Sequence, residues 1–182
     1  DAVYSCSQKG LSCPPGASPV SFSSRARDKI LKRKTLVPNF YLDMKQIIQY
    51  LGGSQRTYHH TAPINSMYAI YQALYDLKSE GLDRAINRHL DAHTFLVDGL
   101  RELGIKMLVE KEYRLPSLNA AVIPKGVDDI KIREKLIKEY DIEIGGGLGP
   151  FAGKIWRIGL MGHSAKISNA DKLLNAFKEI LK

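Results

Sequence analysis

The chain has 182 residues, 44% of them hydrophobic, which is enough for one domain or two small ones with a true core. No apolar run approaches the roughly 20 residues that a membrane helix needs, so we expect no membrane association. The net charge of +8 would suit an acidic partner such as a nucleic acid. Because no recognition motif and no aromatic–basic interleaving accompany the charge, we expect no nucleic-acid binding. We attribute the charge to a solvated helix face or to half of a protein whose acidic half is missing.

The first 60 residues predict two short strands and two helices. Residues 1–22 are expected to form a strand, a loop that holds Lys9, a Pro/Gly turn and a second strand near 19–22. Ser23 or Ser24 is a plausible N-cap for a basic helix that runs to about residue 33. A further helix is expected over 41–51, before Gly52-Gly53.

Two long amphipathic patterns follow and meet at Gly81. We expect Asn65 to cap the first helix, because an apolar stripe at helical spacing follows it: Met67, Ile70, Tyr71, Leu74 and Leu77. The second pattern runs from Leu82 to Leu103 and ends at Gly104. Gly81 either kinks one helix or joins two, and it is our candidate boundary between a first domain, 1–80, and a second, 81–182.

The last 80 residues predict a different kind of domain. Strands are expected at 105–109, 118–123, 142–144 and 154–161, and helices are expected from Asp128 or Asp129 to about 140 and from Ser168 to the end. This β-β-α-β-β-α order favours a small sheet covered by two helices and the long helix, which is an α+β layer domain.

The beginning of the chain and its cysteines bear on processing and compartment. The chain starts with Asp1 rather than Met and shows no signal peptide, which indicates a processed chain or a fragment. Six residues separate Cys6 from Cys13, which is not a metal-binding spacing. We interpret both as reduced thiols of an intracellular protein and expect the cytoplasm, since no peroxisomal tripeptide ends the chain.

Lys9 is a candidate catalytic amine. It lies in Ser5-Cys6-Ser7-Gln8-Lys9-Gly10, before Pro14-Pro15-Gly16, so small and turn-forming residues hold its backbone in place. A lysine that forms a Schiff base with an aldehyde must be held in this way. Taken alone the signal is weak, because most lysines are surface charges.

Histidines occur in two places that invite a ligand. The run 56–63, Arg-Thr-Tyr-His-His-Thr-Ala-Pro, precedes a predicted helix and suits a phosphate, although a simple capping loop explains it equally well. His89 and His93 have the spacing of a helical zinc pair, but Leu90 stands where that motif has Glu and no third ligand is evident. We therefore expect no metal.

Two further features lie in the last third of the chain. The run Gly145-Gly146-Gly147-Leu148-Gly149 fits a mobile loop at the edge of a substrate pocket, or a plain connection between strands. Arg157 lies in an otherwise apolar strand, where a guanidinium is costly unless it is paired. It can grip a substrate carboxylate or form a structural ion pair.

Together, and in this order, these motifs resemble the class V pyridoxal-phosphate aminotransferases, most closely those of the alanine–glyoxylate and serine–pyruvate type. The resemblance runs from Val3 to Leu181 and includes Tyr-Ser-x-Ser-Gln-Lys-x-Leu, Tyr-His-His-Thr-x-Pro, Gly-Gly-Leu-Gly and Arg-Ile-Gly-Leu-Met-Gly. It implies an α/β fold of PLP-dependent fold type I, of which this chain is the C-terminal part of the large domain followed by a small α+β domain.

The resemblance also implies roles for individual residues. Lys9 matches the lysine that forms the Schiff base with pyridoxal 5'-phosphate and shuttles the substrate proton, and Gln8 matches a neighbour that contacts the cofactor. Tyr58 and Thr61 match the pair that reaches the cofactor phosphate from the other subunit of a homodimer. Arg157 matches the arginine that binds the substrate carboxylate, and Gly147 lies in the loop beside that substrate.

The implied reaction moves an amino group from a small amino acid, alanine or serine, to glyoxylate or pyruvate. The family pairs the pyridine nitrogen with an Asp upstream of the lysine and grips the phosphate with an upstream loop, and this chain matches neither. The alternative is therefore a non-catalytic C-terminal fragment or dimerisation part, inactive without the missing N-terminal half. We predict no useful transaminase activity for the 182-residue chain alone.

Overall fold

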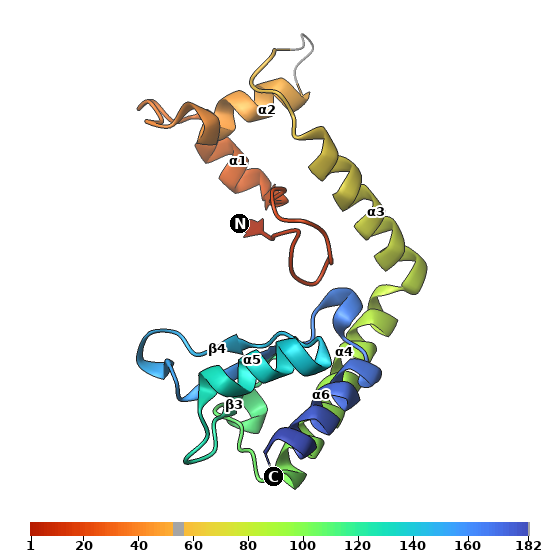
Figure 1. Cartoon of the computed structure of the whole chain (residues 1–182). Coiled ribbons are helices and arrows are strands. Elements are labelled where there is room, and N and C mark those ends of the chain that lie inside the picture. The colour runs from red at the N-terminus through yellow and green to blue at the C-terminus, as the bar shows by residue number, and fades with distance from the viewer. Residues whose placement is uncertain (53–56, 182) are drawn as a thin grey trace. The chain divides into compact units, whose positions relative to one another are not determined.

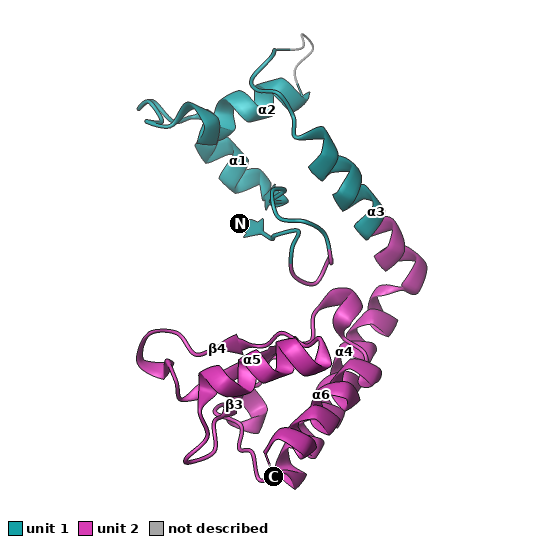
Figure 2. Cartoon of the chain, in the orientation of Figure 1, with its two compact units in different colours: residues 1–8, 13–73 teal, residues 9–12, 74–182 magenta. Residues whose placement is uncertain are grey.

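The computed structural model describes residues 1–52 and 57–181, and these divide into two compact units (Figures 1 and 2). Unit 1 comprises residues 1–8 and 13–73, and unit 2 comprises residues 9–12 and 74–182. The short segment 9–12 therefore belongs to unit 2, although the chain on both sides of it belongs to unit 1. The domain boundary at Gly81 stays a prediction about the intact protein.

Unit 1 begins with a small antiparallel sheet. Strands β1 (Ala2–Tyr4) and β2 (Val20–Phe22) pair with Ala2 opposite Phe22 and Tyr4 opposite Val20. Helix α1 (Ser24–Leu31) follows, and Ser23 Oγ caps it by accepting from the Ala26 amide at 3.2 Å. A 3₁₀ turn (Phe40–Leu42) leads to α2 (Met44–Gly52). The two predicted strands and the basic helix are confirmed.

The two long helices are α3 (Ile64–Glu80) and α4 (Leu82–Glu102). Gly81 separates them with a φ of +89°, so the predicted break is confirmed. The predicted cap at Asn65 is wrong, because Pro63 O already accepts from the Met67 amide and Asn65 lies in the first turn. The predicted apolar stripe is only partly buried. Ile70 is buried, whereas Met67 and Tyr71 are exposed.

Unit 2 contains a three-stranded antiparallel sheet in the order β3-β5-β4. Its strands are β3 (Leu118–Val122), β4 (Gly145–Gly146) and β5 (Ile155–Gly159). Helices α5 (Asp129–Tyr140) and α6 (Ile167–Ile180) complete the unit, with short 3₁₀ turns at Lys111–Tyr113, Gly149–Phe151 and Gly162–Ser164.

Three boundary predictions in unit 2 are wrong. Residues 105–109 form a single bridge, Met107 to Ala121, rather than a strand. The pairing predicted at 142–144 begins instead at Gly145. Helix α6 begins at Ile167, so Ser168 lies inside it and does not cap it.

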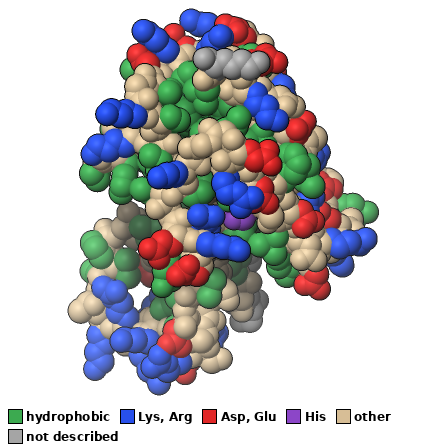
Figure 3. All heavy atoms as spheres, turned by 90° about the horizontal axis from the view of Figure 1, so that it is seen from below, with side chains coloured by type: hydrophobic (Ala, Val, Ile, Leu, Met, Phe, Trp, Pro, Cys, Tyr) green, Lys and Arg blue, Asp and Glu red, His purple; other side chains and the backbone are tan. Residues whose placement is uncertain are grey.

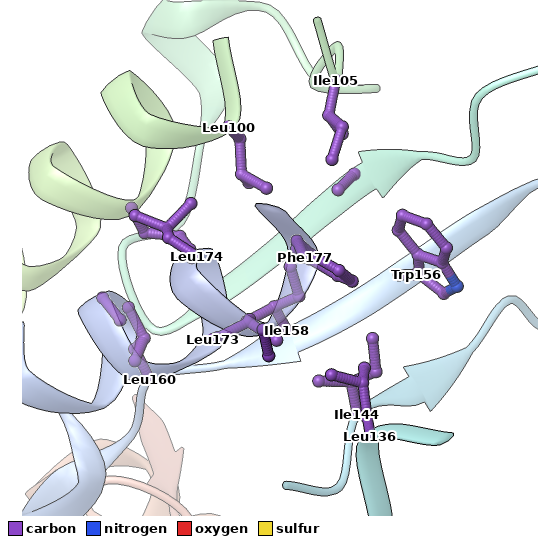
Figure 4. Packing of buried hydrophobic residues seen from close by; sticks show 14 of the residues in the cluster. Leu100, Ile105, Leu136, Ile144, Trp156, Ile158, Leu160, Leu173, Leu174 and Phe177 are labelled. Carbon is purple, nitrogen blue, oxygen red and sulfur yellow. The ribbon is translucent and has the colours of Figure 1, made fainter. Parts of the chain in front are cut away.

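The core of unit 2 lies between the sheet and its helices and decides which way Arg157 faces. Trp156 and Ile158 of β5 are buried in it, and the Trp156 ring stacks on Phe177 of α6 with centroids 5.0 Å apart (Figure 4). Helices α4 and α6 approach so closely that a Cβ on Gly99 would lie 2.3 Å from Leu174 Cδ1. Since side chains alternate along a strand, Arg157 lies on the opposite face of β5 from Trp156 and Ile158.

Large hydrophobic side chains also remain at the surface. On the face in Figure 3 they are interspersed with charged residues of both signs. Along α3, Tyr68 is 73% and Tyr71 is 69% exposed. None of the helices in the described parts of the chain combines the length and apolarity needed to cross a membrane.

Candidate active site

Lys9 lies in a tight turn of four residues, Lys9–Ser12, which we call the Lys9 turn. The Ser12 amide donates to Lys9 O at 3.0 Å and closes it. Ser12 has a φ of +54°, a left-handed conformation that is unusual for a residue with a side chain. The Lys9 side chain is exposed, as is that of Gln8, so the amine is open to a ligand.

Ser7 holds the loop that leads to Gln8, within unit 1. It is fully buried, its hydroxyl donates to Pro14 O at 2.7 Å, and its carbonyl accepts from the Cys13 amide at 3.1 Å. The run Pro14-Pro15-Gly16 therefore has a structural role, because Pro14 O accepts the hydrogen bond from the Ser7 hydroxyl that holds the loop together. The thiol of Cys13 is buried beside this loop and Cys6 is half-buried, both of them free cysteines.

Tyr58 and Thr61 are brought together in unit 1. Their side-chain oxygens lie 2.6 Å apart, and both residues are exposed. His59 between them is buried, stacks on Phe40 with ring centroids 4.3 Å apart and donates from Nε2 to Phe40 O at 3.0 Å. Two adjacent hydroxyls on an anchored loop are suitable donors for a phosphate.

The two histidines of this loop are bound to each other. Their Nδ1 atoms are 2.7 Å apart. Because Phe40 O can only accept, the proton in the bond to it is carried by His59 Nε2. Arg56 of the same motif lies outside the described residues.

Arg157 lies in β5 between two small cross-strand neighbours, Ala120 of β3 and Gly145 of β4. Its Nε donates to Gly146 O at 2.7 Å, which fixes the guanidinium beside the glycine-rich run. A Cβ on Gly145 would lie 3.1 Å from Arg157 Nη2, so glycine leaves room for this group. The side chain is half-buried, and none of the ion pairs in the described structure involves it.

Gly147 has a packing reason to be glycine. A Cβ there would lie 1.9 Å from the backbone oxygen of Phe151. Gly146 packs against Asp129 and Arg133, whose side chains form an ion pair of 2.8 Å, and Asp129 also accepts from Trp156 Nε1. The hydrogen bond to Asp129 raises the pKa of Arg133 above its ordinary value. The glycine-rich run is therefore packed on a charged and hydrogen-bonded base.

The predicted site residues fall into both units. Gln8, Tyr58 and Thr61 belong to unit 1, whereas Lys9, Gly147 and Arg157 belong to unit 2. Within the units, the structure joins Tyr58 to Thr61, and Arg157 to the backbone of Gly146 next to Gly147.

The second histidine pair is engaged in holding the fold of unit 2. His89 Nδ1 donates to Ala85 O at 2.7 Å and its Nε2 accepts from the Gly162 amide at 2.9 Å. His93 Nδ1 is 2.6 Å from Oδ1 of the buried Asn119. No group of three or more metal-ligating side chains occurs in the described ranges.

Sequence reasoning missed the residues that surround the Lys9 turn. The His163 amide donates to Ser12 Oγ at 2.6 Å, and Arg88 donates to Gly162 O at 2.7 Å. The only sequence signal for this contact is a glycine, Gly162, in the middle of a polar turn after β5. A positive φ at a serine has no sequence signal.

The residues present fit pyridoxal phosphate in their chemistry. An exposed amine on a fixed turn suits its aldehyde, and the adjacent Tyr58 and Thr61 hydroxyls suit its phosphate. A guanidinium free of ion pairs with the described carboxylates suits the carboxylate of an amino acid.

Comparison with solved structures places the fold. The alanine–glyoxylate aminotransferase of Nostoc sp. matches with a TM-score of 0.94 and 48% identity over 100% of this chain and 48% of that one. The ureidoglycine–glyoxylate aminotransferase of Bacillus subtilis matches with a TM-score of 0.93 and 32% identity over 100% of this chain and 46% of that one. The predicted α/β fold of PLP-dependent fold type I is confirmed.

Comparison of the sequence with curated proteins identifies the family of the chain. The alanine–glyoxylate aminotransferase of Callithrix jacchus is 42% identical over 184 residues, which cover 100% of this chain and 44% of the relative. A scan against family models matches none. The chain belongs to the class V pyridoxal-phosphate-dependent aminotransferases and corresponds to their C-terminal half, so it spans about half the length of these relatives.

Proposed function

We propose that the protein is part of a pyridoxal-phosphate-dependent transaminase that moves an amino group from alanine or serine to glyoxylate or pyruvate. The observation that carries this proposal is Arg157, a half-buried guanidinium with small neighbours on both sides and no ion pair to a described carboxylate. Such a group can bind the carboxylate that amino acids and 2-oxo acids share. The names of the relatives support glyoxylate as the acceptor.

The proposed roles are those that the family resemblance implies, and the exposure and hydrogen bonds of the side chains support them. Lys9 attaches the cofactor and moves the proton at the substrate Cα, and Gln8 contacts the cofactor. Tyr58 and Thr61 donate to the cofactor phosphate, across the interface of a homodimer with shared active sites. Arg157 binds the substrate carboxylate and so orients the Cα–H bond, while Gly147 lets the adjacent loop pack closely beside it.

When bound, pyridoxal phosphate supplies an electron sink that makes the substrate Cα–H acidic. The free amine of Lys9 accepts that proton. We further propose that residues 1–80 belong to the large domain and 81–182 to the small domain of the intact protein. The two free thiols, Cys6 and Cys13, support an intracellular and therefore reducing compartment, for which we propose the cytoplasm.

A second candidate is a part without catalytic activity of its own, which serves folding or dimerisation. The observation that favours it is the coverage of 44% of the relative, together with the absence from this chain of a match to the ring-nitrogen aspartate of the family. The two candidates agree on the family and differ on what the 182 residues do alone.

The test is a titration of the chain with pyridoxal phosphate, followed by absorbance. We expect a new band that is lost on Lys9→Ala and kept on Lys45→Ala, since Lys45 is another exposed lysine, on α2. A band that survives Lys9→Ala, or that depends equally on both lysines, would count against the proposed function.

A further inference from the structure

The Lys9 turn is seated on a second turn of unit 2. This second turn, Met161–Ala165, follows β5, and we call it the Gly162 turn. The His163 amide donates to Ser12 Oγ at 2.6 Å. Ser12 and His163 are 151 positions apart in the chain, so the contact is a tertiary one that joins the neighbourhood of Lys9 to the sheet that carries Arg157.

The fit between the two turns leaves no room for a side chain on Gly162. Gly162 is buried and has a φ of +54°. A Cβ there would lie 1.9 Å from Ser12 Oγ and 2.9 Å from Gly10 O. The Lys9 turn therefore contacts the Gly162 turn both through a hydrogen bond and through close steric fit.

The conformation of Ser12 requires this support. A residue with a side chain is strained in the left-handed region, and it persists there only where its surroundings hold it. The surroundings here are the bond from the Ser12 amide to Lys9 O and the bond from His163 to its hydroxyl. The same residue thus closes the turn that carries Lys9 and attaches it to unit 2.

The Gly162 turn is in turn fixed by α4. Arg88 Nη1 donates to Gly162 O at 2.7 Å and to Ala165 O at 2.9 Å. Glu80 holds Arg88 from the other side, with 2.8 Å between Arg88 Nη2 and Glu80 Oε2. His89 Nε2 accepts from the Gly162 amide, so both carbonyl and amide of this glycine are bound.

We infer that Ser12 is a positioning residue for Lys9. Ser12 positions the lysine by binding to the Gly162 turn, which Arg88 and His89 hold in place. The inference deepens the proposed function and rests on it for the role of Lys9. The contacts that it invokes, however, are contacts of this chain and can be tested without any cofactor.

The experiment uses the full chain and three variants. Ser12→Gly keeps the left-handed backbone and removes the acceptor, Ser12→Asn tolerates this backbone and restores an acceptor, and Ser168→Ala is a matched control on the exposed surface of α6. Hydrogen exchange of the Ser12 and His163 amides is measured by mass spectrometry. Ser12→Gly removes the hydrogen bond from the His163 amide to Ser12 Oγ, so exchange should become roughly threefold to tenfold faster. We expect the rate to recover in Ser12→Asn and to be unchanged in Ser168→Ala.

A second readout links the turn to the lysine. The pyridoxal phosphate concentration that gives half of the absorbance change should rise by a similar factor in Ser12→Gly and recover in Ser12→Asn. A general loss of stability would instead speed exchange throughout unit 2. Gly162→Ala gives an independent check: because the added methyl meets Ser12 Oγ, its effect on exchange should be smaller in the Ser12→Gly background.

The outcomes separate the two claims. Unchanged exchange at His163 in Ser12→Gly would overturn the inference, whatever the cofactor does. Faster exchange with unchanged cofactor affinity would also overturn it, since the turn would then be held without consequence for Lys9. An absorbance change that survives Lys9→Ala would instead overturn the proposed function.

Discussion

Glu80 shows how a single charged residue supports the candidate site from a distance. It forms a two-pronged ion pair with Arg88, the residue that holds the Gly162 turn. The hydrogen bond from Arg88 lowers the pKa of Glu80 below its ordinary value of 4.5, although partial burial opposes this shift. The same bond raises the pKa of Arg88.

This pair predicts a pH-dependent effect of Glu80→Gln. Because the folded-state pKa of Glu80 is depressed, its contribution is fully present above pH 4.5 and is lost as pH falls through the folded value. Both side chains are about a third exposed, 28% and 32%, so solvent screening limits the loss to about 1 kcal/mol.

The measurement is urea unfolding at pH 7 and at pH 3. We expect Glu80→Gln to be less stable than the unsubstituted chain at pH 7 and to approach it at pH 3. Glu134→Gln, which removes a more exposed pair with Lys138, is the matched control and should change less. An equal deficit at both pH values would contradict the assignment.

Individual residues of the candidate site show what a sequence can and cannot reveal. Lys9, Tyr58, Thr61 and Arg157 were predicted as site residues because each lies in a motif of a known family. Ser12 was not found, because its importance depends on a backbone conformation and on a contact 151 positions away. Gly147 was expected in a mobile loop, whereas the nearby Phe151 oxygen gives it a packing reason.

At the scale of elements, the prediction of helix caps succeeded at the start of α5 and failed at Asn65 and Ser168. Asp128 or Asp129 was expected to cap a helix, and the structure selects Asp128, whose Oδ1 accepts from the Ile130 and Lys131 amides at the start of α5. The strand predicted at 105–109 was wrong, because the hydrophobic alternation is present there but the pairing with β3 is limited to one bridge. Tertiary pairing, which the sequence does not contain locally, decides such cases.

The Asp128 cap on α5 should contribute to the stability of the chain. Asp128→Ala should destabilise the chain by about 1 kcal/mol, because it leaves two amides of the first turn without their acceptor. Asp128→Asn keeps a side-chain acceptor and should lose much less. Thermal unfolding of the three proteins measures the difference, and equal melting temperatures for Asp128→Ala and Asp128→Asn would show that the cap contributes nothing.

At the scale of the whole molecule, the chain corresponds to the C-terminal half of its relatives, and part of the apolar stripe on α3 is exposed, including Met67 and Tyr71. We propose that its site residues bind a carboxylate, donate to a phosphate and offer an amine, but the family's ring-nitrogen aspartate has no counterpart among them. We therefore propose that transamination needs residues of the relatives that have no match in this chain.

We accordingly predict that the isolated chain shows no useful transaminase activity. The measurement is pyruvate formation from alanine and glyoxylate with pyridoxal phosphate in excess, compared with the intact relative from Nostoc sp. as a positive control. Measurable turnover by the isolated chain, abolished by Lys9→Ala, would contradict this prediction while supporting the family assignment.

We propose above all that Lys9 is the lysine that binds the cofactor. Its most direct test is to incubate the chain with substoichiometric pyridoxal phosphate, reduce with borohydride and map the modified lysines by peptide mass spectrometry. We expect modification to be concentrated on Lys9, well above exposed lysines such as Lys45 and Lys131. Modification spread evenly over the exposed lysines, or concentrated on another one, would contradict it.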